Sequence, residues 1–167
     1  MTVPADALRL RAATAADHRF LADMLLVALN WNRDRAAFHL ADIDLEPMFA
    51  RYIEGWPRLG DQGAVAESSG EPVGAVWVRL FGSAEPGFGF VFADVPELSI
   101  GVRDGLRGRG VGSALMERIH RDAGAAGARR ISLSVEPGNR AMALYEKLGY
   151  RVAVTRFDMV TMVKDLR

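Results

Sequence analysis

The residues best suited to chemistry lie between positions 98 and 119, in the stretch LSIGVRDGLRGRGVGSALMERI. An apolar run is followed by a loop with glycine at positions 108, 110 and 112, and then by an amphipathic run. A helix that begins after such a loop offers free backbone N–H groups and the positive end of its dipole. Glycine lets an anion reach that backbone, and phosphate is the anion most commonly held there. The spacing predicts a phosphate-binding loop with Arg107 and Arg109 at its rim.

Two familiar phosphate-binding motifs fit this loop poorly. A P-loop requires a lysine where Val111 stands, so that motif is excluded. A dinucleotide-binding loop has its first glycine directly after the strand, whereas four or five residues intervene here and Ser113 replaces the last glycine. Glu136 ends the next predicted strand, as an acidic ribose ligand would, but too little chain follows to complete a doubly wound sheet. The dinucleotide site therefore stays open only as the weaker alternative.

The sequence around the loop predicts the elements that position it. Alternating or continuously apolar runs indicate strands at residues 8–13, 62–68, 73–81, 97–102, 129–135, 150–156 and 157–166. Apolar residues at helical spacing indicate helices at residues 14–31, 42–55, 110–127 and 139–149. Strands grouped early, followed by a β-α-β-α-β order, indicate one α/β domain of the α+β kind with a mixed sheet, over residues 1–167.

Three local patterns sharpen these assignments. Thr14 and Asp17 resemble a capping box at the start of the first helix. Ser69 and Gly70 predict a hairpin turn between two strands. The second helix, at residues 42–55, would bury one face made of Leu45, Met48, Phe49, Tyr52 and Ile53.

Composition excludes several classes of protein. Lys plus Arg equals Asp plus Glu at 21 each, so the basic excess typical of a nucleic-acid binder is missing. The chain has no cysteine, which excludes disulfides, thiolate metal ligands and a cysteine nucleophile, and we expect no metal site. No apolar run is as long as a membrane span, and the first residues lack the apolar core of a signal peptide. We expect a cytoplasmic protein without nucleic-acid or membrane partners.

The loop also matches R-x-x-G-x-G through Arg107, Gly110 and Gly112. A strand and the segment NRAMALYEKLGY follow in order. This arrangement resembles the GNAT superfamily of acyl-CoA-dependent N-acetyltransferases, and the resemblance runs from Glu97 to about Val154. The first 90 residues match only in the order of their elements. The resemblance implies a single-domain GNAT-like fold, with a mostly antiparallel mixed sheet flanked by helices and splayed fourth and fifth strands.

The same resemblance implies a binding site for acetyl-CoA as co-substrate. The pyrophosphate would lie on the backbone of residues 108–113, the pantetheine arm would pair with the strand near residues 100–102, and Asn139 would hydrogen-bond that arm. The implied residues are Ile100, Val102, Arg107, Gly108, Arg109, Gly110, Val111, Gly112, Ser113 and Asn139. These residues also have structural interpretations. Arg107 and Arg109 could be solvated charges, and Asn139 could be a helix cap.

Amine acetylation needs a neutral amine, a stabilised carbonyl oxygen and a proton for the leaving thiolate. The resemblance implies that Tyr145 gives the proton and that Glu97 acts as base, with Asp94 and Glu85 as secondary candidates. Alternatively, Tyr145 is only an aromatic residue of the core, and Glu97 is a solvated carboxylate at the end of a strand. The three histidines, His18, His39 and His120, are expected at surface or partly buried helix positions.

Aromatic residues in two segments would border the acceptor cleft of this fold. Trp31 follows the first helix, and Phe88 and Phe90 precede the fourth strand. Such a cleft would favour a small amine with a hydrophobic body, although these rings could instead close the core. Trp56 and Trp77 are assigned to packing.

Together these features predict an N-acetyltransferase that moves an acetyl group from acetyl-CoA to a primary amine, with a small molecule as the expected acceptor. Direct attack in a ternary complex is expected because no cysteine could carry the acyl group. The alternatives are a non-catalytic acyl-CoA sensor and a protein N-terminal or lysine acetyltransferase. The resemblance also makes a homodimer possible.

Overall fold

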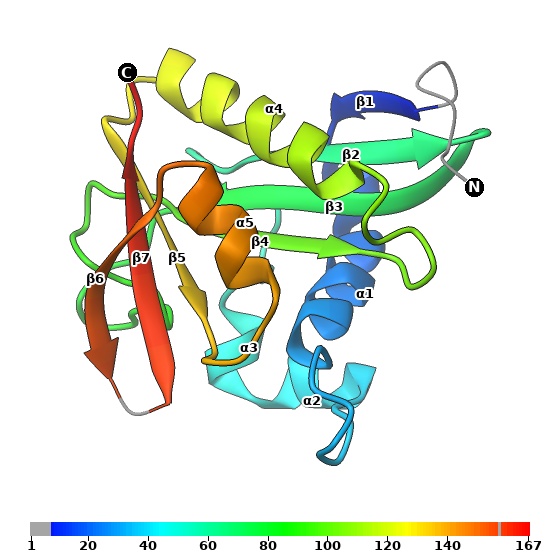
Figure 1. Ribbon diagram of the computed structural model, residues 1–167, viewed down its shortest axis with the longest axis horizontal. Coiled ribbons are helices and arrows are strands. Elements are labelled where there is room, and N and C mark those ends of the chain that lie inside the picture. The colour runs from blue at the N-terminus through cyan, green and yellow to red at the C-terminus, as the bar shows by residue number, and fades with distance from the viewer. Residues whose placement is uncertain (1–7, 157) are drawn as a thin grey trace.

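Seven strands form one sheet in the computed structural model, which describes residues 8–156 and 158–167 (Figure 1). The strands are β1 Leu8–Ala12, β2 Gln62–Ser68, β3 Glu71–Arg79, β4 Glu97–Val102, β5 Arg130–Val135, β6 Arg151–Arg156 and β7 Met159–Asp165. Their order is β1-β2-β3-β4-β5-β7-β6, and only β4 and β5 pair in parallel. The predicted mixed, mostly antiparallel sheet is confirmed. Phe157, the predicted start of the last strand, and the N-terminal residues considered for a leader lie outside the described residues.

Helices cover both faces of the sheet (Figure 1). They are the 3-10 turn η2 Ala15–Asp17 and the helices α1 His18–Leu29, α2 Leu40–Leu45, α3 Pro47–Ala50, α4 Val111–Ala125 and α5 Ala141–Lys147. Figure 1 shows α4 and α5 in front of the sheet and α1 behind it. Each face has its own apolar core, one packed under α4 and the other under α1. None of the described helices is long and apolar enough to cross a membrane.

The two halves of the sheet separate between β4 and β5. β4 pairs with β3 along its whole length, whereas its pairing with β5 is limited to Glu97 opposite Ser132. Figure 1 shows β5 leaving β4 at a steep angle, with α5 in front of the gap. The predicted splay of the fourth and fifth strands is therefore confirmed, and it begins at Glu97.

The predicted helix over residues 42–55 is wrong in its extent. α2 begins earlier, at Leu40, because the His39 N–H donates to Asp42 Oδ2 at 2.7 Å. It ends at Leu45, because Pro47 lacks an N–H group and holds Glu46 in an extended conformation. Leu45 was expected to be buried and is instead 76 % exposed, since the break turns it away from the core.

Other local predictions hold. Tyr52 and Ile53 are buried as expected, although turns rather than a helix carry them. The Thr14 N–H donates to Asp17 Oδ2 at 2.7 Å, as a capping box requires. The hairpin turn lies at Ser69 and Gly70, which both have positive φ. The side chains of Trp56 and Trp77 are buried in packing roles.

Candidate active site

A cleft of about 1090 Å³ follows the gap between β4 and β5 and continues to α1 and α3. It brings together most of the residues singled out in the sequence: Trp31, Phe88, Glu97, Ile100, Val102, Arg107, Gly108, Gly110, Gly112, Ser113, Asn139 and Tyr145. Three of the residues expected to bind a ligand do not line it. Val111 is buried in the core under α4, Phe90 packs against the core on the α1 side, and Arg109 lies outside the cleft.

The edge of β4 that faces the gap carries backbone groups without a strand partner. The Arg103 N–H donates to Val73 O of β3 at 2.8 Å, and Pro96 O accepts from the Ser132 N–H of β5 at 3.0 Å. Because successive residues of a strand direct their backbone groups to opposite sides, those of residues 98, 100 and 102 face β5. The pairing of Glu97 with Ser132 uses the N–H of residue 98, so the groups of residues 100 and 102 are the ones that face the open gap. An extended ligand arm could pair with β4 there as an added strand would.

The loop between β4 and α4 exposes its backbone. Gly105, Gly108 and Gly110 have φ values of 85°, 73° and 84°, a region that favours glycine. A Cβ atom added at Gly108 or Gly110 would meet no atom within 4 Å, so open space borders this backbone. The first N–H groups of α4 follow directly, at the positive end of a 15-residue helix. The loop therefore fits an anionic group such as a pyrophosphate.

Glu97 lies buried at the start of the splay and is only 2 % exposed. Its Oε1 accepts the Tyr52 hydroxyl at 2.7 Å and the Gly89 N–H at 2.8 Å, while its buried Oε2 has no partner among the described residues. Burial raises the pKa of Glu97 to about 7, against the opposing effect of these two hydrogen bonds. A carboxyl group that titrates near neutrality is suited to act as a general base.

The loop between β3 and β4 covers Glu97. A Cβ atom at Gly87 would lie 1.9 Å from Glu97 Oε2, and one at Gly89 would lie 2.7 Å from the backbone carbon of Leu133. These two glycines therefore allow the loop to lie directly on the carboxyl group and on β5. Phe88 O accepts the Thr161 hydroxyl of β7 at 3.3 Å, which fixes the loop from the other side.

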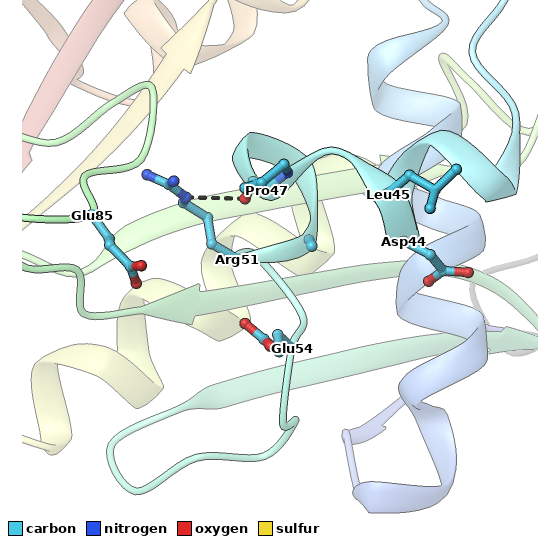
Figure 2. Close-up of a pocket in the computed structure, with 7 residues that line it drawn as sticks. Asp44, Leu45, Pro47, Arg51, Glu54 and Glu85 are labelled. Atoms are coloured by element: carbon cyan, nitrogen blue, oxygen red, sulfur yellow. Dashed lines mark hydrogen bonds between the residues drawn. The ribbon is translucent and has the colours of Figure 1, made fainter.

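Arg51 fixes the same loop from α3. Its guanidinium donates to Pro86 O at 2.7 Å and to Pro47 O at 3.1 Å. Figure 2 shows it beside a second, small pocket of about 210 Å³, across from Glu85. Because these hydrogen bonds occupy the guanidinium, we assign Arg51 to holding the loop over Glu97. Glu85 and Asp94, the secondary base candidates, are exposed and do not line the cleft.

Tyr145 lines the cleft from α5 and is 8 % exposed. Burial raises the pKa of its hydroxyl to about 12, so it keeps its proton at neutral pH. Its ring packs 5.9 Å from that of Tyr150, whose hydroxyl lies 2.7 Å from His120 Nε2. Asn139 lines the cleft too, and its Oδ1 accepts the Ala141 N–H at 3.0 Å, as a helix cap does.

The far end of the cleft is aromatic. The rings of Phe38 and Phe49 lie 5.1 Å apart, that of Phe88 lies 6.3 Å from Phe49, and the Tyr52 ring stacks on Phe88 at 6.3 Å. Sequence reasoning placed Phe49 and Tyr52 only in the core and did not select Phe38. The spacing of Phe49 and Tyr52 on the predicted helix gave no sign that the Tyr52 hydroxyl would reach Glu97 of β4, 45 residues later.

A second group of residues crosses the opening of the splay. Trp31 Nε1 donates to Glu136, and the Arg35 guanidinium donates to both of its carboxylate oxygens at 2.9 and 3.0 Å. Burial acts to raise the pKa of Glu136, but the hydrogen bonds from Arg35 and Trp31 lower it below its usual range. The sequence had suggested Glu136 only as a ribose ligand. Here its charge is neutralised from the loop after α1, which closes one side of the cleft.

Comparison with known proteins agrees with this geometry. Residues 26–150 match the Acetyltransferase (GNAT) family. A 72-residue stretch, 40% of the chain, is 43% identical to mycothiol acetyltransferase from Corynebacterium glutamicum, of which it covers only 25%.

Two solved structures share the fold over nearly the whole chain. A ribosomal-protein-alanine N-acetyltransferase from Brucella melitensis matches with a TM-score of 0.68 and 24% identity, covering 95% of this chain and 99% of that one. A putative acetyltransferase from Salmonella typhimurium, solved with acetyl-CoA, matches with a TM-score of 0.67 and 24% identity, covering 96% and 95%. Because the family match spans more than half of the chain, this protein belongs to the acetyltransferase (GNAT) family and is a transferase enzyme.

Proposed function

We propose that this enzyme transfers an acetyl group from acetyl-CoA to the primary amine of a small molecule with a hydrophobic body. One observation carries the proposal above the others. A buried carboxyl group, Glu97, stands where the unpaired edge of β4 begins and where the aromatic end of the cleft meets it. Both substrates could therefore reach the same point from opposite ends of one cleft.

The β4 side of the cleft suits acetyl-CoA, which supplies an activated thioester. The gap-facing backbone groups of Ile100 and Val102 would hydrogen-bond the pantetheine arm, and Asn139 would add a side-chain contact. The N–H groups of residues 108–113 would hold the pyrophosphate at the start of α4, with Arg107 as an exposed cation beside them.

The chemistry requires three groups that the chain supplies. Glu97 would take the proton of the attacking amine, directly or through one water molecule. A backbone N–H on the part of the β4 edge that has no strand partner would stabilise the carbonyl oxygen as it becomes negative. Tyr145 would give its proton to the sulfur as the carbon–sulfur bond breaks. No cysteine exists to hold the acyl group, so the amine attacks directly within the ternary complex.

The acceptor end favours an amine attached to an apolar body. Phe38, Phe49 and Phe88 form its walls, and Glu136 is neutralised by Arg35. Few acidic groups are therefore left to attract a polycation, whereas a single ammonium group could approach Glu97.

The test is an assay of thiol release from acetyl-CoA with three kinds of acceptor. A set of arylalkyl amines is compared with polyamines and with short peptides that carry a free N-terminus or a lysine. We expect kcat/KM to be highest for the arylalkyl amines. Higher values for peptides would establish a protein acetyltransferase instead. Binding of acetyl-CoA without thiol release for any acceptor would refute the proposed transfer to amines.

A further inference from the structure

We propose that Tyr52 is a positioning residue for the reaction, whose hydroxyl holds Oε1 of Glu97 as a hydrogen-bond acceptor and so leaves Oε2 as the oxygen that exchanges a proton. The inference rests on the proposed function, because it gives meaning to Glu97 as the base. It starts from the unequal surroundings of the two carboxylate oxygens.

The Tyr52 hydroxyl has only one direction in which to donate. Its oxygen accepts the backbone N–H of Phe88 at 2.7 Å, so its own proton points to Glu97 Oε1, also 2.7 Å away. The Gly89 N–H donates to the same oxygen at 2.8 Å. Because two donors already bind Oε1, a proton added to that oxygen would have to displace a hydrogen bond. Oε2 is therefore the oxygen that takes the proton.

The packing around Tyr52 keeps this geometry fixed. Its backbone oxygen accepts Trp77 Nε1 at 3.0 Å in the buried core, and its ring meets the Phe81 ring edge-on at 5.1 Å. Burial and the nearby Glu97 raise the pKa of the Tyr52 hydroxyl well above its ordinary value, so it stays protonated and remains a donor.

Oε2 faces a different environment. It is buried without a partner among the described residues, and so is the hydroxyl oxygen of Ser132, which pairs with Glu97 across β4 and β5. Paired residues of parallel strands direct their side chains to the same face, so both orphan oxygens lie on one side of the sheet. Neither oxygen has a hydrogen-bond donor among the described residues, so a proton on Oε2 would displace no existing hydrogen bond.

The charged neighbours do not take part in this arrangement. Arg79 pairs with Glu97 in the register of β3 and β4, but its guanidinium is bound to Asp61 and to backbone carbonyls. The Arg51 guanidinium is bound to the carbonyls of Pro47 and Pro86. Ser132 of β5 and Thr161 of β7 carry no charge. Tyr52 is thus the side chain that sets the hydrogen bonding of this carboxyl group.

Tyr52 also links the base to the wall of the acceptor site. The same Phe88 whose N–H binds the Tyr52 hydroxyl offers its ring to the aromatic end of the cleft and stacks on the Tyr52 ring. An acceptor that contacts Phe88 would therefore lie next to the hydrogen bonds that position the base.

The experiment compares Tyr52→Phe with Tyr150→Phe. Both remove a buried tyrosine hydroxyl that makes a hydrogen bond, but that of Tyr150 binds His120, away from Glu97. The pH dependence of kcat/KM is recorded for both variants. In parallel, carbon-13 NMR of labelled glutamate follows the carboxyl titration without substrate, with Glu97→Gln identifying the signal. The loss of a hydrogen bond to a charged carboxylate is expected to shift the midpoint of its titration by about one pH unit.

We expect Tyr52→Phe to move both the carboxyl titration and the acidic limb of the rate profile upward by about that amount, while Tyr150→Phe moves neither. If neither moves in Tyr52→Phe, the positioning role is refuted. If the carboxyl titration moves but the rate profile does not, Glu97 is not the base, and this inference fails together with that part of the proposed function. The NMR titration decides the hydrogen bonding even if no acceptor amine is found.

An infrared measurement covers the case in which Tyr52→Phe does not fold. The carbonyl band of protonated Glu97 is isolated on the wild-type protein by subtracting the spectrum of Glu97→Gln. A carbonyl Oε1 that accepts two hydrogen bonds absorbs at a lower frequency than a free one. A band at the free-carbonyl position would show that Oε1 carries the proton, and it would overturn the assignment.

Discussion

The two ends of the cleft are built in different ways. The end proposed for acetyl-CoA is made mostly of backbone, from one continuous segment that runs from β4 through the glycine loop into α4. The acceptor end is made of side chains that meet across the fold, such as Tyr52 with Glu97 over 45 positions and Trp31 with Glu136 over 105.

This difference teaches how each end should respond to substitution. A backbone site tolerates changes of most side chains but not the addition of atoms at its glycines. A site made of side chains depends on burial and on hydrogen bonds between distant residues, so single substitutions should change its chemistry. The following changes test that contrast.

Glu97→Gln should have the largest effect on activity. Glutamine is nearly the same size and can still accept hydrogen bonds from Tyr52 and Gly89, but it cannot take a proton. We expect kcat/KM to fall roughly 10²–10⁴-fold above pH 7, the usual contribution of a general base. The dissociation constant of acetyl-CoA, measured by calorimetry, should stay unchanged. A rate close to that of the wild type would remove Glu97 from the mechanism.

The same substitution should stabilise the fold at high pH. The pKa of Glu97 is about 7 when folded, against a model-peptide value of 4.5, so between these values the unfolded chain loses its proton first. The stability that Glu97 provides at low pH is therefore lost as pH rises toward and through 7, by about 3 kcal/mol in total. In urea unfolding, the free energy of unfolding of Glu97→Gln should exceed that of the wild type by about 3 kcal/mol at pH 8 and by little at pH 4.5. A difference independent of pH would contradict the raised pKa.

Gly101→Ala and Gly112→Ala separate an effect on folding from an effect on the backbone proposed to bind acetyl-CoA. A Cβ atom at Gly101 would lie 2.3 Å from the carbonyl oxygen of Met24, so the variant should lose about 3 kcal/mol in chemical unfolding. At Gly112 the nearest atom is Leu144 Cδ2 at 4.0 Å, so stability should change by less than about 1 kcal/mol. Its methyl group should still weaken acetyl-CoA binding by about tenfold, or roughly 1.4 kcal/mol. Unchanged affinity would move the ligand away from this helix start.

Tyr145→Phe should slow turnover without weakening acetyl-CoA binding. The variant keeps the buried ring but removes the hydroxyl proposed to protonate the sulfur. We expect kcat to fall by roughly 10- to 100-fold, at the low end for a general acid. Single-turnover measurements would show that the chemical step is the slow one. An unchanged kcat would make Tyr145 a core aromatic only.

Arg35→Ala should have the smallest effect and should appear in acceptor selectivity. Both members of the Arg35–Glu136 pair are partly exposed, so its loss should cost no more than about 1 kcal/mol. The carboxylate of Glu136 would then keep only the hydrogen bond from Trp31, and its charge would no longer be neutralised at the opening of the cleft. We expect KM for diamines to fall relative to that for apolar monoamines by a few-fold. Arg33→Ala, which removes an exposed pair with Asp104, is the matched control and should not change this ratio.

Most of the fold could be predicted from the sequence, because its strands and its longer helices have clear periodicity. The segment around Pro47 is the exception, since the apolar spacing continues through a residue that breaks the helix. The glycine loop and the line of residues along β4 were also predictable, and the structure places most of them in one cleft. Their roles toward acetyl-CoA stay predictions until a ligand is measured.

The sequence by itself determined the glycine loop, the start of α4 and the strand before it, because these depend on backbone conformations that neighbouring residues dictate. It also supplied Glu97 and Tyr145 as candidates. Only the tertiary structure decided that Glu97 would be buried, that Tyr52 and Gly89 would bind one of its oxygens, and that Arg35 would neutralise Glu136. The physical reason is that burial and hydrogen bonding between distant segments set a pKa, and such contacts exist only once the chain has folded.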